Sequence, residues 1–225
     1  MNKLTVLLVV LPLLIPAPAL ASEPYDFVSA FVRTLEMCKI AQERQKIADT
    51  STIASMMQAM IVFRNVIRQV NSVIMPYRDS KNEYVQKSAD SLCMIYTSVM
   101  QNSEQAVAFF ERGLNDPSEY NSQRGTWLRK LSEIGARADE DWRGLATATA
   151  MTTYTLVDME RTVGGNLRFL TITQSERDQL RSQLLGSFGN QVRAGFTEGQ
   201  SSLIDASAIL LWGFLAQDWK PADTK

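Results

Sequence analysis

Methionine and cysteine come closest to forming a chemical site in this chain. Three methionines lie within about one helical turn of each other, and two others adjoin the two cysteines. Thioethers are soft ligands that suit Cu(I), so Met56, Met57 and Met60 are candidate copper ligands. Methionine is also a common core residue, because its flexible side chain fills irregular gaps. We favour core packing for these three residues and keep a Cu(I) site as the alternative.

Cys38 and Cys93 are the only cysteines of the chain, and their positions predict a disulfide. In an up-down-up arrangement the first and third helices run parallel, which places both cysteines at similar heights, on or beside an apolar stripe. In an oxidising compartment such a pair is normally bonded. The bond would stabilise the fold by roughly 4 kcal/mol on the loop-entropy model. The alternative is two free, buried thiols.

Asp139, Glu140 and Asp141 form an acidic run that could supply acid–base groups or oxygen ligands for a divalent cation. Successive residues of a helix do not face one another, so three in a row do not converge on one site. We favour a solvated helix face, with Asp141 and Trp142 nearest to the apolar side. A hydrolase that uses carboxylates alone is the enzymatic alternative.

The chain contains no histidine, which excludes Ser-His and Cys-His nucleophile pairs and His-ligated zinc. Its glycines form neither a GxGxxG motif nor a P-loop. The 225 residues are 45% hydrophobic, enough apolar material for a sizeable core. The formal charge of −1 argues against nucleic-acid binding, which needs a basic face.

Residues 1–21 predict a secretory signal peptide that is cleaved. Lys3 forms a short basic region, Leu4 to Ile15 is an apolar run, and Ala19 to Ala21 is a small-x-small cleavage signal. The apolar run gives about 18 Å of helix, too short for a hydrocarbon core of about 30 Å. We therefore expect a bacterial periplasmic or secreted protein without a transmembrane segment after cleavage. Residues 22–219 would form a single domain and residues 220–225 a flexible tail.

Hydrophobic periodicity predicts helices along the whole mature chain. The strongest pattern runs from Ile53 to Ile74 in alternating steps of three and four, like a heptad seam, and Pro76 ends it. The segment Asp49–Thr52 offers N-cap residues for this helix, while a continuous helix through it stays open. We expect the other helices from Pro24 over about 22 residues, from a capping box at Ser80 and Glu83 to Leu114, from Trp127 to Arg161, from a capping box at Thr173 and Glu176 to Val192, and from Leu203 to Trp219.

These patterns predict an all-α fold, an elongated antiparallel (up-down) bundle of five or six helices with one disulfide. Residues 167–173 would be an extended connector. Small residues between Gly144 and Met151 would let another helix approach closely. The last helix is apolar nearly all round, so we favour a central core helix. The alternative is a docking surface for a partner or for the membrane interface.

Two functional hypotheses follow from the long amphipathic helices and the lack of catalytic motifs. The first is an exported, non-enzymatic bundle that binds an envelope protein partner, as an adaptor or assembly component. The second is a carrier or sensor bundle that holds a small apolar ligand between helices, lined by Met57, Phe63, Tyr96 and Phe110. We expect no cofactor under either hypothesis, and the sequence leaves the oligomeric state open.

Overall fold

All regular structure in the computed structural model is helical. The structure describes residues 23–49, 51–162, 173–194 and 202–216, and these contain no strand. The elements are α1 (Glu23–Lys46), α2 (Ile53–Ile74), the 3-10 helix η1 (Met75–Asp79), α3 (Glu83–Asn115), α4 (Pro117–Ser122), α5 (Arg124–Thr162), α6 (Gln174–Ala194) and α7 (Leu203–Leu215). The all-α prediction is confirmed. The predicted signal peptide, the connector up to residue 172 and the tail lie outside the described residues.

Several helix ends follow the local sequence as predicted. The Thr52 hydroxyl accepts a hydrogen bond from the backbone N–H of Ser55 at 3.1 Å and caps α2, and α1 ends at Lys46, so no continuous helix joins the two. Pro76 lies in η1, immediately after the end of α2. At the start of α6, the Glu176 carboxylate accepts from the backbone N–H of Thr173 at 2.7 Å, which completes the predicted capping box.

The start of α3 differs from the prediction, because Asn82 and not Ser80 is its N-cap. The Asn82 side chain accepts from the backbone N–H groups of Tyr84 and Val85 at 3.1 and 3.2 Å. The Ser80 hydroxyl instead donates to Glu23 of α1 at 3.3 Å. The capping box at Ser80 is therefore wrong: this serine links two helices.

The described residues form more helices than the five or six expected, because Pro117–Ser122 makes a short helix of its own. Asp116 caps this helix by accepting from the backbone N–H of Glu119 at 2.9 Å, with Pro117 in the first turn. The next helix, α5, then begins at Arg124 and follows the predicted range closely.

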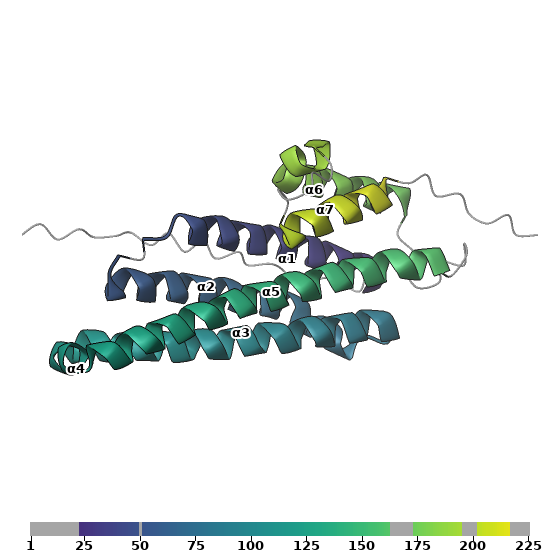
Figure 1. Cartoon of the computed structure of the whole chain (residues 1–225). Coiled ribbons are helices and arrows are strands. Elements are labelled where there is room, and N and C mark those ends of the chain that lie inside the picture. Colours follow the sequence, from purple (N-terminus) through teal and green to yellow (C-terminus); the bar gives the residue numbers. More distant parts are fainter. Residues whose placement is uncertain (1–22, 50, 163–172, 195–201, 217–225) are drawn as a thin grey trace, which may run out of the picture.

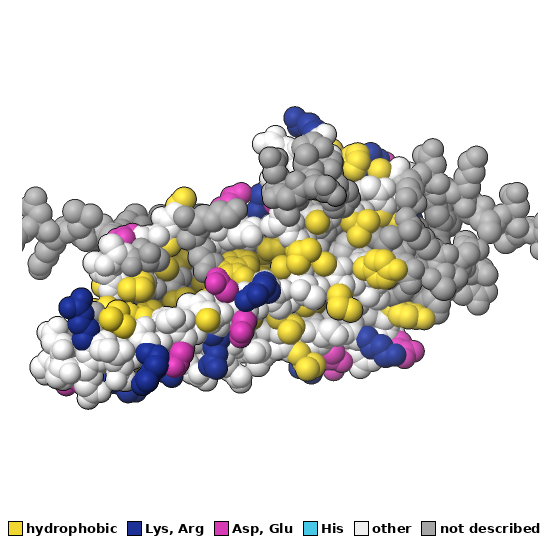
Figure 2. All heavy atoms as spheres, viewed as in Figure 1, with side chains coloured by type: hydrophobic (Ala, Val, Ile, Leu, Met, Phe, Trp, Pro, Cys, Tyr) yellow, Lys and Arg dark blue, Asp and Glu magenta, His cyan; other side chains and the backbone are white. Residues whose placement is uncertain are grey.

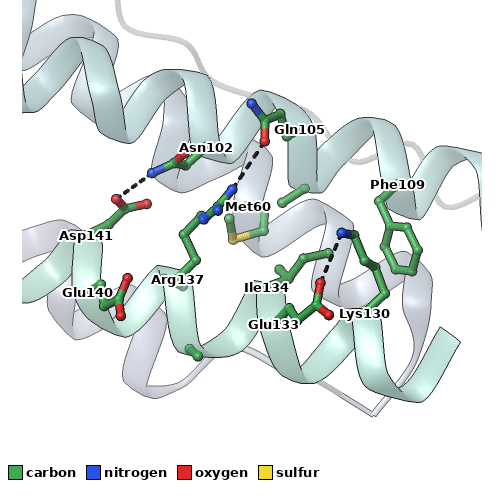
Figure 3. A pocket seen from close by; sticks show the side chains of 13 residues that line it. Met60, Asn102, Gln105, Phe109, Lys130, Glu133, Ile134, Arg137, Glu140 and Asp141 are labelled. Atoms are coloured by element: carbon green, nitrogen blue, oxygen red, sulfur yellow. Dashed lines mark hydrogen bonds and ion pairs between the residues drawn. The ribbon is translucent and has the colours of Figure 1, made fainter. Parts of the chain in front are cut away.

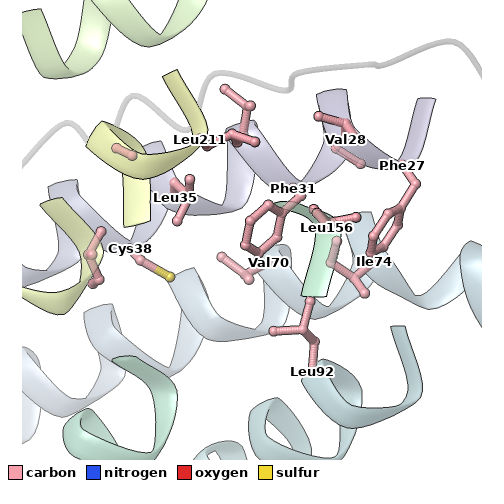
Figure 4. Packing of buried hydrophobic residues seen from close by; sticks show 14 of the residues in the cluster. Phe27, Val28, Phe31, Leu35, Cys38, Val70, Ile74, Leu92, Leu156 and Leu211 are labelled. Carbon is pink, nitrogen blue, oxygen red and sulfur yellow. The ribbon is translucent and has the colours of Figure 1, made fainter. Parts of the chain in front are cut away.

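A single apolar core joins six of the described helices, α1, α2, α3, α5, α6 and α7 (Figure 4). The side chains of α1 at its centre, Phe27, Phe31 and Leu35, are completely buried. The other helices contribute Val70 and Ile74 of α2, Leu92 of α3, Leu156 of α5 and Leu211 of α7. Burying each such side chain stabilises the fold by about 1.5–3 kcal/mol, so this core holds the helices together.

The order of the helices in space follows from which faces are apolar. Helix α2 packs against both α1 and α3, and α5 runs along α3 (Figure 1). Helix α7 contacts α1, α5 and α6, and lies over the C-terminal half of α5. Ile204, Leu211 and Leu215 of α7 are buried, in agreement with the core role favoured from the sequence. Among the described helices, none has both the length and the apolar composition of a membrane span.

Helix α5 contacts α7 and buries several small polar residues. Thr149, Thr152 and Thr153 are buried on this helix. The hydroxyls of Thr149 and Thr153 donate to the carbonyls of Leu145 and Thr149, at 2.8 and 3.0 Å. Because these hydroxyls are satisfied within the helix, they can be buried without a polar partner on α7.

Lys39 of α1 connects the last two helices to the core. Its ammonium forms an ion pair with Asp205 near the start of α7, with 3.6 Å between Nζ and Oδ1. It also donates to the carbonyl of Ser187 at 3.3 Å and lies 4.6 Å from the centre of the Phe188 ring. Phe188 has a non-helical backbone and kinks α6 at this point. A single, mostly buried cation therefore fixes the kink and the start of α7 on α1.

The predicted disulfide is wrong, because Cys38 and Cys93 are both free, buried thiols. Helix α2 packs against both α1 and α3. The α3 side chain close to Cys38 is Tyr96, and burial raises the pKa of its hydroxyl well above the usual value. Cys93 lies near Arg78 and Asp90. Since α2 packs against both α1 and α3, matching heights on α1 and α3 do not bring the two thiols within bonding distance. Burial raises the pKa of Cys38 to about 12.

Gly113 gives a direct test of the packing between α3 and α5. A Cβ atom at this position would lie 2.8 Å from the indole of Trp127, which is itself buried against Phe109 at 4.1 Å between ring centres. We expect Gly113→Ala to lower the free energy of unfolding by about 1–2 kcal/mol, since overpacking outweighs the gain in helix propensity. Urea unfolding measures this change.

Gly135 on α5 is the matched control for this substitution, because a Cβ atom there would meet no atom within 4 Å. We expect Gly135→Ala to raise the free energy of unfolding by up to about 1 kcal/mol. Equal stabilisation by the two alanine substitutions would contradict the close contact between Gly113 and Trp127.

Candidate functional site

An interhelical groove that carries charged groups lies between α3 and α5 (Figure 3). This α3–α5 groove has a volume of about 370 Å³ and is formed by α3 from Asn102 to Phe109 and by α5 from Lys130 to Asp141. Met60 of α2 lies at its floor. The remaining apolar lining comes from Ala106, Ile134, Ala136 and Ala138. The groove therefore combines an apolar floor with polar walls.

Polar contacts across the groove hold α3 and α5 at a fixed spacing. The Asn102 amide donates to the Asp141 carboxylate at 2.8 Å, and the Arg137 guanidinium donates to Gln105 at 3.3 Å. Lys130 pairs with Glu133 on the same helix at 3.0 Å. Figure 3 shows these side chains along the groove opening, where a bound group would meet them.

Asp141 is the member of the acidic run that the fold partly buries. Asp139 and Glu140 are exposed, whereas Asp141 is half-buried beside the α3–α5 groove. Desolvation raises the pKa of the Asp141 carboxyl, and the neighbouring Glu140 raises it further. The hydrogen bond from Asn102 and the charge of Arg137 act in the opposite direction. Glu140 also lines the groove, whereas Asp139 is not among its lining residues.

The side chains of the α3–α5 groove are carboxylates, amides and cations around an apolar floor. No group of three or more histidine, cysteine, aspartate or glutamate side chains that could hold a metal ion occurs among the described residues.

The three candidate copper ligands all lie on α2 and are partly buried. Met60 lines the α3–α5 groove, while Met56 and Met57 are not among its lining residues. The Cu(I) site therefore remains a prediction, and Met60 has a second role as part of the groove floor.

The four residues predicted to line an apolar ligand site are distributed over the bundle. Phe63 contacts Trp142 of α5, with 5.0 Å between the ring centres, and Phe110 packs beside Phe109. Tyr96 points toward Thr34 and Cys38 of α1. Tyr96 and Phe110 are about 21 Å apart along α3, so one compact molecule does not contact both. Met57 is partly buried on α2, on the same helix as Phe63.

Phe63 lines a second opening, here called the α1–α2 slot, with a volume of about 400 Å³. Its lining consists of Ala41, Arg44, Ile47, Ala48 and Asp49 at the end of α1, and Ser55, Gln58, Ala59, Val62 and Phe63 of α2. In Figure 2, hydrophobic side chains gather in the strip between α1 and α5, over α2. The slot is thus more apolar than the α3–α5 groove.

The sequence interpretation did not identify Arg44, Ile47, Gln105 or Arg137 as site residues. Ile47 carries a usable signal, because it is an apolar residue outside the stripe of α1 and next to a turn. Gln105 and Arg137 have no such signal in the sequence, because their contact joins two helices whose spacing is set by the fold.

Neither a protein-family model nor a curated protein nor a solved structure matches this chain.

Asp141→Asn tests the electrostatics of the groove. The raised pKa means that the charged carboxylate is less favourable in the folded state than in the unfolded state. The stability that the protonated group contributes is present at low pH and is lost as the pH rises through the raised pKa. We therefore expect Asp141→Asn, which keeps an oxygen to accept from Asn102, to increase the free energy of unfolding at pH 7. The difference in the free energy of unfolding between the variant and the wild type becomes smaller as the pH falls.

Urea unfolding at pH 7 and at lower pH measures this difference. Asp139→Asn is the control, because Asp139 is exposed on the same turn of α5. We expect this substitution to change the free energy of unfolding little at either pH. A loss of stability in Asp141→Asn at pH 7 would show that the carboxylate charge is favourable in the folded protein.

Proposed function

We propose that this chain is an exported, non-enzymatic helical bundle that binds a protein partner, as an adaptor or assembly component of a bacterial cell-envelope complex. The signal-like sequence of residues 1–21 supports export to the periplasm or beyond. An elongated bundle whose long helices alternate in direction would present extended faces to a partner. The protein would act there by binding.

The observation that carries this proposal is the α3–α5 groove. From Lys130 to Asp141 it follows α5 for about 16 Å, which is three helical turns. This length matches a partner helix that inserts side chains at positions i, i+4 and i+7. The apolar floor would bury those side chains, and the charged walls would set the partner's orientation.

Site-specific photo-crosslinking in the native host tests the adaptor function. We expect a photoreactive residue at Gln105, which is exposed and lines the groove, to form one discrete protein adduct in intact cells. The same residue at Glu111, exposed on another side of α3, serves as the control and forms none. Ala138→Phe fills the groove and weakens the Gln105 adduct. Absence of an adduct at Gln105, or the same adduct from both positions, would contradict the proposal.

The α1–α2 slot favours a second candidate function, the carrier or sensor of a small apolar ligand. It places Phe63, one of the residues predicted for such a ligand, in an opening whose volume falls within the range of small-molecule sites. Native mass spectrometry of protein from its own host tests this function. A carrier retains a small additional mass that organic extraction removes, whereas protein without any such mass would contradict it.

A further inference from the structure

The α1–α2 slot has features that restrict the kind of molecule it accepts. Its walls include three small or apolar residues, Ala41, Ala59 and Val62, beside Phe63. Ile47 lies at this opening with 84% of its surface exposed. A large aliphatic side chain exposed beside an apolar opening offers additional contact area to an apolar ligand.

Two charged residues, Arg44 and Asp49, line the opening and differ in their polar contacts. Arg44 is exposed, and no ion pair to it occurs within the described part of the chain. The Asp49 carboxylate accepts a hydrogen bond from the backbone N–H of Ser51 at 2.8 Å, and its hydrogen bonds to Ser51 lower its pKa. Asp49 therefore already has local partners, whereas the guanidinium of Arg44 is available to an anion.

We propose that the α1–α2 slot binds the alkyl chain of a medium-chain carboxylic acid, with the carboxylate on the Arg44 guanidinium. Guanidinium and carboxylate form two parallel hydrogen bonds, the strongest polar recognition that this opening can provide. The alkyl chain lies along Val62 toward Phe63 and is removed from water. The inference rests on the carrier function and adds the chemical class of the ligand.

Trp142 supplies a reporter for this site, because its ring lies against that of Phe63, with 5.0 Å between the ring centres. Decanoate with a bromine at the chain end would quench the fluorescence of Trp142 as the chain enters the slot. We expect saturable quenching with one site per full-length chain, and loss of that quenching in Trp142→Phe.

Arg44→Gln tests the carboxylate contact, and decanol serves as the uncharged ligand. We expect this substitution to weaken decanoate binding roughly tenfold, the size of one charge-assisted contact, and to leave decanol binding unchanged. Arg68→Gln is the matched control, since Arg68 is an exposed arginine of α2 that pairs with Glu104 and does not line the slot. We expect Arg68→Gln to leave the affinity for both ligands unchanged.

Ala59→Phe tests the slot itself, because the larger side chain would occupy the volume that the alkyl chain needs. We expect it to abolish the binding of both ligands, while Ala54→Phe on the exposed side of α2 retains it. Helical circular dichroism confirms that both variants fold.

The outcomes separate the ligand class from the carrier function. Equal affinity for decanoate and decanol, unchanged in Arg44→Gln, would overturn the carboxylate and leave a carrier of apolar chains. If Ala59→Phe leaves binding unchanged, or if neither ligand binds, both the ligand class and the carrier function are overturned. A dimer in light scattering that Ala59→Phe dissociates would show that a second copy occupies the slot.

Discussion

The structure depends on the burial of the apolar stripe of α1 from two sides. Phe27, Phe31 and Leu35 are completely buried, and their helix contacts α2 on one side and α6 and α7 on the other. Exposing this stripe would cost several kcal/mol for a few side chains, so the helices that cover it have little freedom in their placement. Lys39 adds a polar constraint at the same helix, because its ion pair with Asp205 fixes where α7 begins.

The openings on the molecule follow from the length of α7. This helix has 13 residues, about 20 Å, whereas α5 has 39 residues, about 58 Å. Helix α7 therefore covers only the C-terminal half of α5 and leaves the N-terminal half without this cover (Figure 1). The α3–α5 groove and the α1–α2 slot both lie in this less covered half.

Those parts of the fold and of the site that depend on local pattern could be predicted from the sequence. The heptad-like seam of α2, the cap at Thr52 and the capping box at Thr173 are each set by residues within four positions of one another. Met60 was singled out for its sulfur, and Asp141 as the acid nearest to the apolar face; both line the α3–α5 groove. The groove as a whole was not predictable, because Asn102 and Gln105 become site residues only through their contacts with α5.

By itself the sequence determined that this is an all-helical chain, where most helices begin and end, and which face of α1 and α2 is apolar. These properties depend on backbone hydrogen bonding and periodicity over a few residues. The tertiary structure alone decided that Cys38 and Cys93 stay apart, that Gly113 accommodates an indole and that Arg44 faces an apolar slot. Such contacts depend on the distance and rotation between helices, which are set by the packing of the entire core.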